Sequence, residues 1–314
     1  MLVDTASLYF RAFFGLPSSL SAPDGRQVNA VRGLLDFLAR FVSQYRPTHL
    51  ACCWDNDWRP AWRTELVPSY KAHRVDPGGI SDVVGAGGRG AVNPQTEVAP
   101  EELQAQIPMI VAVLSALGLP IVGADDHEAD DVIGALASTS TMPADVVTGD
   151  RDLFQLVDDA RAVRVLYVGR GISRHEVITD AVLRDKYGID GAGYADFATL
   201  RGDPSDGLPG VSGIGEKTAA RLIADHGDIE GILAAASAGR LSPALAAKLA
   251  AGIDYLGAAL PVVAVRRDLV LGLTDSDLVL PKEPAHPVAL ADLAAELGLG
   301  ASAERIVAAL ALPH

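Results

Sequence analysis

Short apolar runs alternate with longer stretches of helical periodicity through the first half of the chain. Apolar runs that end at a polar residue or a turn predict buried strands at residues 1–4, 49–54, 121–122, 145–148 and 163–168. Apolar positions that recur every three or four residues predict helices at residues 28–45 and 104–117, and another from Glu128 onward. Strands that alternate with helices indicate an α/β fold, with a mostly parallel sheet flanked by helices.

The second half of the chain shows mainly helical patterns. From about residue 178 we expect a helix over residues 185–197, alanine-rich helices separated by Gly239 and Gly252, and a C-terminal helical segment over residues 289–312. Residues 76–100 differ from both halves, because they are rich in glycine and almost without large apolar side chains. This composition predicts a mobile loop.

Acidic residues lie just past the carboxyl ends of the predicted strands. Asp4, Asp55 and Asp150 each stand at such a position, on three different strands. In open parallel sheets, ligands bind outside the carboxyl ends of the strands. We therefore expect these three side chains to converge on one place.

A denser group of acids begins the helix that follows the 121–122 strand. Glu128, Asp130 and Asp131 share one arc of this helix, and Asp125 or Asp126 is expected to cap its N-terminus. Taken alone, the segment is equally typical of an ordinary amphipathic helix with an acidic, solvated first turn. The other acids that reach the same edge of the sheet favour a functional site.

Together with the acids of two later turns, these residues form a candidate metal site. Its nine ligands are Asp4, Asp55, Glu128, Asp130, Asp131, Asp150, Asp152, Asp203 and Asp206. Nine neighbouring carboxylates would repel one another strongly unless cations lay among them. Oxygen ligands without histidine or cysteine suit Mg²⁺ or Mn²⁺, and two such ions are the usual apparatus for displacement at phosphorus.

Composition and charge set the remaining limits. The formal net charge of −14 argues, at face value, against nucleic acid, whose binding proteins are usually basic. Setting the nine ligands aside changes the formal charge from −14 to −5, which removes most of that objection. The sequence shows no signal peptide and no membrane span. Cys52 and Cys53 are predicted to be buried thiols, as expected of a cytoplasmic protein.

Residues 208–218, with the sequence LPGVSGIGEKT, fit a helix-hairpin-helix turn. Gly213 and Gly215 allow the backbone to approach a phosphate closely, and the next helix offers its N-terminal N–H groups. Lys217 and Thr218 can add contacts to the same strand, all of them independent of base sequence. The glycine spacing before Lys217 differs from that of a Walker loop.

In this order, the motifs resemble the 5′-nuclease superfamily, which includes flap endonucleases and the 5′→3′ exonuclease domain of bacterial family-A DNA polymerases. The matching strings cover residues 1 to about 265: Leu2-Val3-Asp4, Trp54-Asp55, Tyr70-Lys71-x-His73-Arg74, Glu128-Ala129-Asp130-Asp131-Val132-Ile133-Gly134, Thr148-Gly149-Asp150-x-Asp152 and Gly202-Asp203-x-Ser205-Asp206-x-x-Pro209-Gly210-Val211. Because the chain has no room for a polymerase, it resembles a stand-alone enzyme.

The resemblance implies a PIN-like α/β core with a helix-three-turn-helix grip on duplex DNA. It also implies hydrolysis of phosphodiesters at 5′ ends and 5′ flaps, which leaves 5′-phosphates, with two or three Mg²⁺ or Mn²⁺ ions. One ion would be lined by Asp4, Asp55, Glu128 and Asp130, with Asp131 close by. The other would be lined by Asp150, Asp152, Asp203 and Asp206, and Asp130 and Asp150 would be catalytic.

The resemblance further implies roles for the basic and aromatic run at residues 58–74. Lys71 and Arg74 match arch residues that steer and polarise the scissile phosphate. Tyr70 is a candidate for base stacking, and Arg63 is an expected DNA contact.

At the hairpin, the family often holds K⁺ through backbone carbonyls, here those of Val211, Gly213 and Ile214. The implied partners are DNA with 5′ flaps, nicks or gaps, and a DNA polymerase or ligase. We expect a monomer that does not bind membranes.

The sequence departs from the family at Thr5 and Gly207, where Gly and Asn are common, and residues 76–100 are longer and richer in glycine than the usual arch. A haloacid-dehalogenase-like phosphatase would need Asp-x-Asp, but position 6 is Ala6. The alternatives are a PIN-type ribonuclease and a DNA-junction binder that does not cleave. We expect a catalytic domain at residues 1–180 with its arch at 57–105, a helix-three-turn-helix region at 181–270, and a C-terminal helical extension at 271–314.

Overall fold

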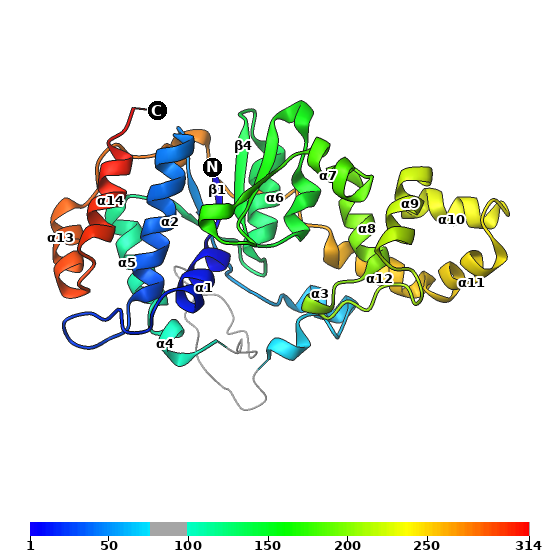
Figure 1. The fold of residues 1–314 in the computed structure, drawn as a ribbon, viewed down its shortest axis with the longest axis horizontal. Helices are drawn as coiled ribbons and strands as arrows, with labels where there is room; N and C mark the ends of the chain where they lie inside the picture. The colour runs from blue at the N-terminus through cyan, green and yellow to red at the C-terminus, as the bar shows by residue number, and fades with distance from the viewer. Residues whose placement is uncertain (76–98, 314) are drawn as a thin grey trace.

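A six-stranded sheet lies at the centre of the protein, whose computed structural model describes residues 1–75 and 99–313 (Figure 1). The strand order is β3-β2-β1-β4-β5-β6; β1 to β5 are parallel and β6 is antiparallel to β5. The strands are β1 (Leu2–Asp4), β2 (Ala51–Cys53), β3 (Ile121–Val122), β4 (Ala144–Thr148), β5 (Val163–Tyr167) and β6 (Glu176–Ile178).

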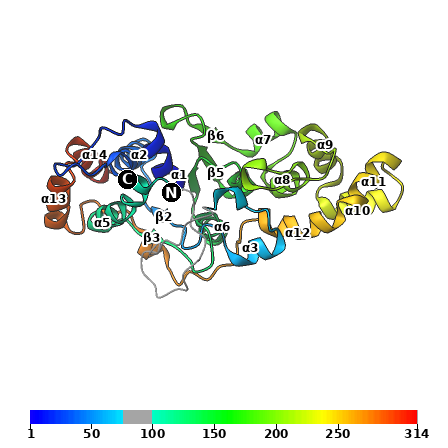
Figure 2. The ribbon, with the colours of Figure 1, turned by 90° about the horizontal axis from the view of Figure 1, so that it is seen from below.

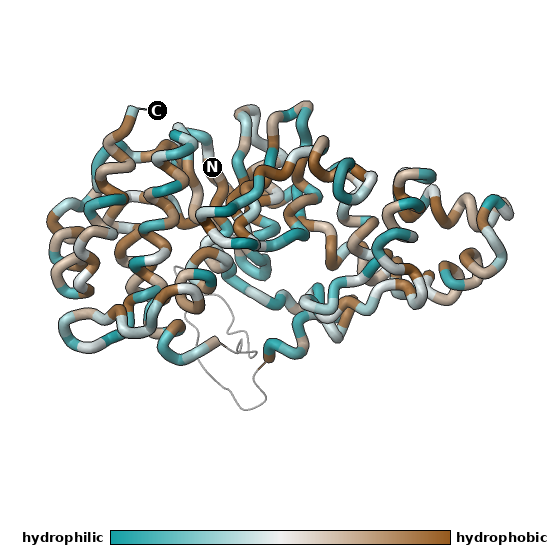
Figure 3. Tube along the Cα trace, viewed as in Figure 1, coloured by the Kyte–Doolittle hydropathy of each residue, from teal (hydrophilic) through white to brown (hydrophobic). Residues whose placement is uncertain are grey.

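Helices cover both faces of the sheet, because successive residues of a buried strand point to opposite sides. Leu2 faces the core formed with α6 (Ala129–Thr139), whereas Val3 faces the core formed with α1 (Thr5–Gly15), α2 (Asn29–Tyr45) and α5 (Ile107–Leu117). Apolar segments line the interior on both sides of the sheet (Figure 3). Cys52 and Cys53 are buried free thiols that face opposite cores.

A helical region extends from the side of the sheet that carries α6, away from α2 and α5 (Figures 1 and 2). Its helices are α7 (Asp180–Tyr187), α8 (Tyr194–Arg201), α9 (Glu216–His226), α10 (Ile229–Ser237), α11 (Pro243–Ala251) and α12 (Ile253–Val263). The helix expected over residues 185–197 is therefore divided in two. Gly188, with φ of 75°, ends α7 in the left-handed region.

The chain then returns along the sheet and ends in a pair of helices on its other side. α13 (Pro287–Glu296) packs on α5 and α14 (Ala301–Leu310) packs on α2. We expected one helical segment over residues 289–312, but Gly298 and Gly300 both have positive φ and separate the two helices. The short helices α3 (Ala61–Leu66) and α4 (Glu101–Gln104) flank residues 76–98, so most of the predicted mobile loop and part of the expected arch lie outside the described residues.

The expected α/β architecture, a mostly parallel sheet flanked by helices and followed by a helical region, is confirmed. The antiparallel strand β6 is an addition that the sequence pattern did not predict. Within the part of the chain that the structure describes, no single helix is long and apolar enough to cross a membrane; α11 and α12, bent by 65°, pass that test only as a pair.

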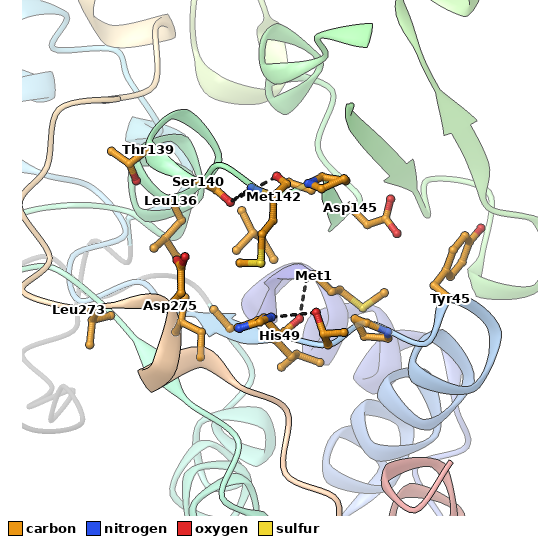
Figure 4. A pocket seen from close by; sticks show the side chains of 18 of the residues that line it. Met1, Tyr45, His49, Leu136, Thr139, Ser140, Met142, Asp145, Leu273 and Asp275 are labelled. Atoms are coloured by element: carbon orange, nitrogen blue, oxygen red, sulfur yellow. Dashed lines mark hydrogen bonds between the residues drawn. The ribbon is translucent and has the colours of Figure 1, made fainter. Parts of the chain in front are cut away.

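A cavity of about 390 Å³ lies at the amino ends of β1, β2 and β4 (Figure 4). It is lined in part by Met1, His49, Met142 and Asp145, and the ammonium group of Met1 donates a hydrogen bond to the carbonyl of His49 at 2.8 Å. The acidic residues stand past the opposite, carboxyl ends of the same strands. This cavity is therefore separate from the candidate site.

The packing of α14 on α2 predicts a large contribution of the C-terminal helices to stability. Ile306 of α14 is fully buried, so Ile306→Ala should lower the free energy of unfolding by about 2–5 kcal/mol. Urea unfolding followed by circular dichroism measures this loss. Val288→Ala in α13 is the control, because that side chain is 74% exposed. Equal losses for the two variants would contradict the packing.

Candidate active site

The strand order brings the acidic residues to one edge of the sheet. The order reverses on either side of β1, and the crevice outside the carboxyl ends of β1 and β4 is where such sheets bind ligands. Asp4 ends β1, Asp55 follows β2 and Asp150 follows β4. The predicted convergence of these three strand-end acids therefore agrees with the topology.

Asp4 is fixed by two hydrogen bonds. Its Oδ1 accepts from the N–H of Ser7 at 3.0 Å, which caps α1, and its Oδ2 accepts from the hydroxyl of Thr148 at 2.7 Å. Burial and the nearby charge of Asp55 raise the pKa of Asp4 to about 7. Two neighbouring elements thus hold a carboxylate that shares its surroundings with other acids.

Asp55 lies at the N-terminus of α6. Its Oδ1 accepts from the N–H of Ala129 at 2.7 Å, so the positive end of the helix dipole faces it. Burial nevertheless raises its pKa to about 6, and the charges of Glu128 and Asp131 act in the same direction. Asp55 and the acidic helix turn therefore form one group.

Glu128 and Asp131 form a capping box at the start of α6, in which each side chain accepts from the backbone N–H of the other residue. The expectation that Asp125 or Asp126 caps this helix is wrong. Both lie in the preceding turn with exposed side chains, and Asp126 has φ of 59°. Glu128 is the cap because Asp131, three residues later, can accept a hydrogen bond from its backbone N–H.

Asp130 connects the two groups of predicted ligands. Burial raises its pKa well above the usual range, and the charges of Asp150, Asp4 and Glu128 add to this rise. Asp150 is oriented by its own loop: its N–H donates to Thr148 Oγ1 at 2.9 Å, and its Oδ1 accepts from the N–H of Asp152 at 2.8 Å. Residues from α6, β1 and the loop after β4 therefore face one another.

Asp152, Asp203 and Asp206 complete the acidic set. Burial raises the pKa of Asp152 well above its usual range, and Asp150, Asp206 and Asp203 raise it further. The Oδ1 atom of Asp152 is buried and has no hydrogen-bond partner. Burial also raises the pKa of Asp206 to about 6. Each of the nine predicted ligands either has a raised pKa or carries a charge that raises the pKa of another ligand. The nine carboxylates therefore repel one another.

The basic residues of the 58–74 run lie against these acids. Arg63 is almost fully buried and donates to Glu128 at 3.0 Å and to Asp131 at 2.7 and 2.8 Å. Lys71 forms an ion pair with Glu128, and Arg74 donates to Asp206 at 2.6 Å. Arg63, predicted to contact DNA, is placed where it neutralises carboxylates.

Tyr70, the candidate for base stacking, is also buried. Its hydroxyl donates to Glu128 at 2.8 Å, and its ring lies within 5.1 Å of the Lys71 ammonium. In this arrangement, the ring packs inside the protein and orients Glu128.

The predicted hairpin forms the turn before α9. Gly213 has φ of 74°, which favours glycine, and Gly215 is the N-cap of α9. Lys217 is exposed and Thr218 is half-buried in the first turn of α9. The Gly213 carbonyl accepts from Lys248 Nζ at 2.9 Å.

The acidic set fits a divalent cation by its chemistry. Across residues 1–75 and 99–313, no three acidic, histidine or cysteine side chains stand close enough together to form a preassembled metal site. Several of the oxygens accept from protein donors instead, among them Arg63, Lys71 and Arg74. A bound cation would give the buried Oδ1 of Asp152 a partner and reduce the repulsion among the carboxylates. Oxygen donors suit hard cations.

Some residues that build this site gave no signal in the sequence. Ser7 and Gln155 are ordinary polar residues whose partners are known only from the fold. Lys186 and Arg221 line a surface hollow beside Lys217, together with the acidic Glu216, and Lys186 is paired with Glu176. Only the fold brings these residues to their partners.

Comparison with known proteins identifies the family. The N-terminal, resolvase-like domain of 5′-3′ exonucleases matches residues 1–188, and their C-terminal SAM fold matches residues 189–285. The chain belongs to the 5′-3′ exonuclease family. It is 54% identical to a 5′-3′ exonuclease of Streptomyces coelicolor and 46% identical to one of Mycobacterium tuberculosis; these matches cover 99% of this chain and 99% and 97% of the relatives.

A shorter match joins the chain to DNA polymerase I of Mycobacterium bovis, at 38% identity over 80% of this chain and 26% of the polymerase. Among solved structures, T5 5′-exonuclease with bound zinc aligns at a TM-score of 0.57 and 16% identity, covering 99% of this chain and 98% of that one. Flap endonuclease-1 of Methanococcus jannaschii aligns at 0.54 and 15% identity, covering 99% and 92%. These neighbours confirm the expected 5′-nuclease fold.

The protein is therefore a 5′→3′ exonuclease, and this conclusion holds over the ribonuclease and non-cleaving alternatives. T5 5′-exonuclease has been solved with bound zinc, and the T5 flap endonuclease in a complex with DNA and metal ions. The oxygen-only donor set of this chain suits hard divalent cations.

The raised pKa values predict how pH and metal ions affect stability. The pKa of Asp4 is about 7 and those of Asp55 and Asp206 are about 6, above the 3.8 of an ordinary aspartate. The folded state thus holds these protons more tightly than the unfolded chain. Stability without divalent ions should therefore fall as pH rises from about 4 to 7.

Mg²⁺ or Mn²⁺ should offset this loss, by about 2.7 kcal/mol at a concentration about 100 times its dissociation constant. Differential scanning fluorimetry at pH 5 and pH 7.5 measures both effects. A stabilisation by the metal that is equal at the two pH values, or absent at pH 7.5, would be evidence against a metal site built from these acids.

Proposed function

We propose that two or three Mg²⁺ or Mn²⁺ ions bind among the nine acidic residues, and that a 5′ end or 5′ flap of DNA is hydrolysed there to leave a 5′-phosphate. Asp4, Asp55, Glu128 and Asp130, with Asp131 beside them, would hold one ion, and Asp150, Asp152, Asp203 and Asp206 another. Bound ions would stabilise the charge that develops on the phosphate and lower the pKa of water. The single observation that carries this proposal is the burial of these mutually repelling acids at the crevice outside β1 and β4.

Asp130 and Asp150 have the central place in this arrangement. Asp130 comes from α6 and Asp150 from the loop after β4, and the charge of Asp150 is the first electrostatic cause, after burial, of the raised pKa of Asp130. Ions held by these two residues would therefore lie side by side, where both could contact the reacting phosphate. A hydrogen bond from the N–H of Asp152 to Asp150 Oδ1, at 2.8 Å, keeps Asp150 in place.

Lys71 and Arg74 would bind the scissile phosphate. Both lie against predicted ligands, Lys71 at Glu128 and Arg74 at Asp206, so their charges are already at the site. A phosphate that enters between them would accept hydrogen bonds from both cations and lose part of its negative charge. Tyr70 and Arg63 would orient Glu128 through their hydrogen bonds to it. The burial of both side chains argues against direct contact with DNA.

The helical region would hold the duplex. N–H groups at Gly213 and Gly215, with Lys217 and Thr218, can bind the phosphates of one strand in the same way for any sequence. K⁺ at the carbonyls of Val211, Gly213 and Ile214 would have to share the Gly213 carbonyl with the ammonium of Lys248.

The proposed organisation is a catalytic domain at residues 1–180 with an arch at 57–105, a DNA-binding region at 181–270 and a C-terminal extension at 271–314. Nicked, gapped and flapped duplexes are the proposed substrates of a monomeric, cytoplasmic enzyme in replication and repair. A DNA polymerase that creates flaps and a ligase that seals nicks are its proposed partners, because each shares a DNA intermediate with this reaction.

Asp150→Asn should lower the cleavage rate by a factor on the order of 10² to 10³, because the variant loses a carboxylate that would hold a divalent ion at the reacting phosphate. A 5′-labelled flap substrate with Mg²⁺ or Mn²⁺, under single-turnover conditions, measures this rate. Flap binding, measured with Ca²⁺, should change little. Asp292→Asn, an exposed change in α13, is the control. Cleavage by Asp150→Asn near the wild-type rate would refute the assignment, and no wild-type cleavage with either metal would refute the nuclease function.

Lys71→Ala should slow single-turnover cleavage about 100-fold, because it removes one cation from the phosphate. Binding of Mn²⁺, measured by calorimetry, should persist because Lys71 is not a metal ligand. Lys282→Ala, an exposed change of the same type, should have no effect on either measurement. A rate for Lys71→Ala that matches the wild type would exclude the proposed role.

A further inference from the structure

We propose that α12 is a rigid spacer between the duplex-binding hairpin and the acidic site, and that Tyr255 and Gln155, which attach its two ends, are positioning residues that determine which phosphodiester is cut. This inference rests on the nuclease function proposed above and concerns its specificity.

One end of α12 is attached to the hairpin. The N–H of Gly210 donates to Tyr255 Oη at 3.1 Å, and the same hydroxyl donates to the carbonyl of Thr199 at 3.4 Å. A Cβ on Gly252, directly before α12, would come within 3.1 Å of Val211. The first turn of α12 therefore lies in direct contact with the loop that precedes the phosphate-binding glycines.

The other end of α12 is attached to the acidic site, through a junction segment that we define as residues 262–267. Gln155 Nε2 donates to the carbonyl of Val263 at 3.0 Å and to that of Asp152 at 2.8 Å, and Gln155 Oε1 accepts from the N–H of Val265 at 3.0 Å. Gln155 is almost fully buried. A predicted metal ligand and the end of α12 thus share one side chain.

The wall formed by α6 holds the same junction segment. Arg63 Nε donates to the carbonyl of Val262 at 3.1 Å, while its other nitrogens bind Glu128 and Asp131. Asp131 Oδ1 also accepts from the N–H of Arg266 at 2.9 Å. A Cβ on Gly134 of α6 would lie 2.4 Å from the carbonyl of Arg266, so the two backbones are in contact.

These contacts have a mechanical consequence. The 11 residues of α12 span about 16 Å at about 1.5 Å per residue. Pro261 removes one intrahelical hydrogen bond near the C-terminal end of α12, and packing against α8 and α3 keeps the helix in position. Hydrogen bonds hold both ends, part-buried at Tyr255 and buried at Gln155 and Arg63, so a change of position at either end would cost these bonds. The distance from the hairpin to the acids, measured along α12, therefore sets the distance along the DNA from the bound duplex to the cut.

Product lengths from a 5′-flap substrate labelled at one end test the spacer at nucleotide resolution. Gln155→Met keeps the side-chain volume and removes three hydrogen bonds, and Tyr255→Phe removes only a hydroxyl group. The wild type should give one dominant product. In each variant, cuts should spread to the neighbouring phosphodiesters, and the share of the dominant product should fall at least twofold.

Two matched controls lie away from α12. Gln106→Met alters a fully buried glutamine that holds the start of α2, and Tyr45→Phe removes a hydroxyl bound to His175 at 2.6 Å. Both should keep the wild-type product pattern, even if they lower stability. Loss of stability alone reduces the amount of active enzyme but leaves the position of the cut unchanged.

If Gln155→Met fails to fold, Tyr255→Phe still decides the question. A wild-type product pattern in Tyr255→Phe, together with one in any folded Gln155→Met, would overturn the spacer while leaving the nuclease function intact. A wild-type protein that cuts no flap would instead contradict the function on which the spacer rests.

Discussion

Mutual repulsion among buried carboxylates is the constraint on which the rest of this structure depends. Acids from five separate parts of the chain meet at one edge of the sheet, where burial raises the pKa values of Asp4, Asp55 and Asp206. Such a group persists only if cations and N–H donors are built around it. Arg63, Lys71 and Arg74 supply fixed cations, and divalent ions would supply the rest. The basic run at 58–74 is therefore part of the acidic site and not a separate surface.

The same constraint connects catalysis to the binding of the duplex. Arg63 neutralises Glu128 and Asp131 and, with the same guanidinium group, holds the end of α12. The charge balance of the site is thus tied to the position of the helical region. The hairpin loop contacts the other end of α12, so the proposed phosphate-binding hairpin and the acidic site belong to one continuous set of contacts. A structure-specific nuclease needs such a connection, because it must measure from a junction to a bond.

The sequence predicted what depends on short-range pattern. Asp4, Asp55 and Asp150 could be assigned to strand ends, because apolar runs mark the strands and a parallel order places their ends together. The contacts of Arg63 and Tyr70 could not be predicted, because their partner Glu128 is 65 and 58 residues away along the chain. For Arg63, the sequence also does not distinguish an arginine that pairs with buried acids from one that binds DNA. The cap of α6 and the breaks at Gly188 and Gly298 also escaped prediction, because neighbouring residues offered equally good signals.

The most direct test of this account is the location of Mn²⁺ by anomalous scattering in crystals grown with a Mn²⁺ concentration that supports cleavage. The account predicts peaks bounded by Asp4, Asp130, Asp150 and Asp152, at the carboxyl ends of β1 and β4. Peaks confined to other places, or no peak at this edge of the sheet, would contradict the claim that these carboxylates form the metal site of the nuclease.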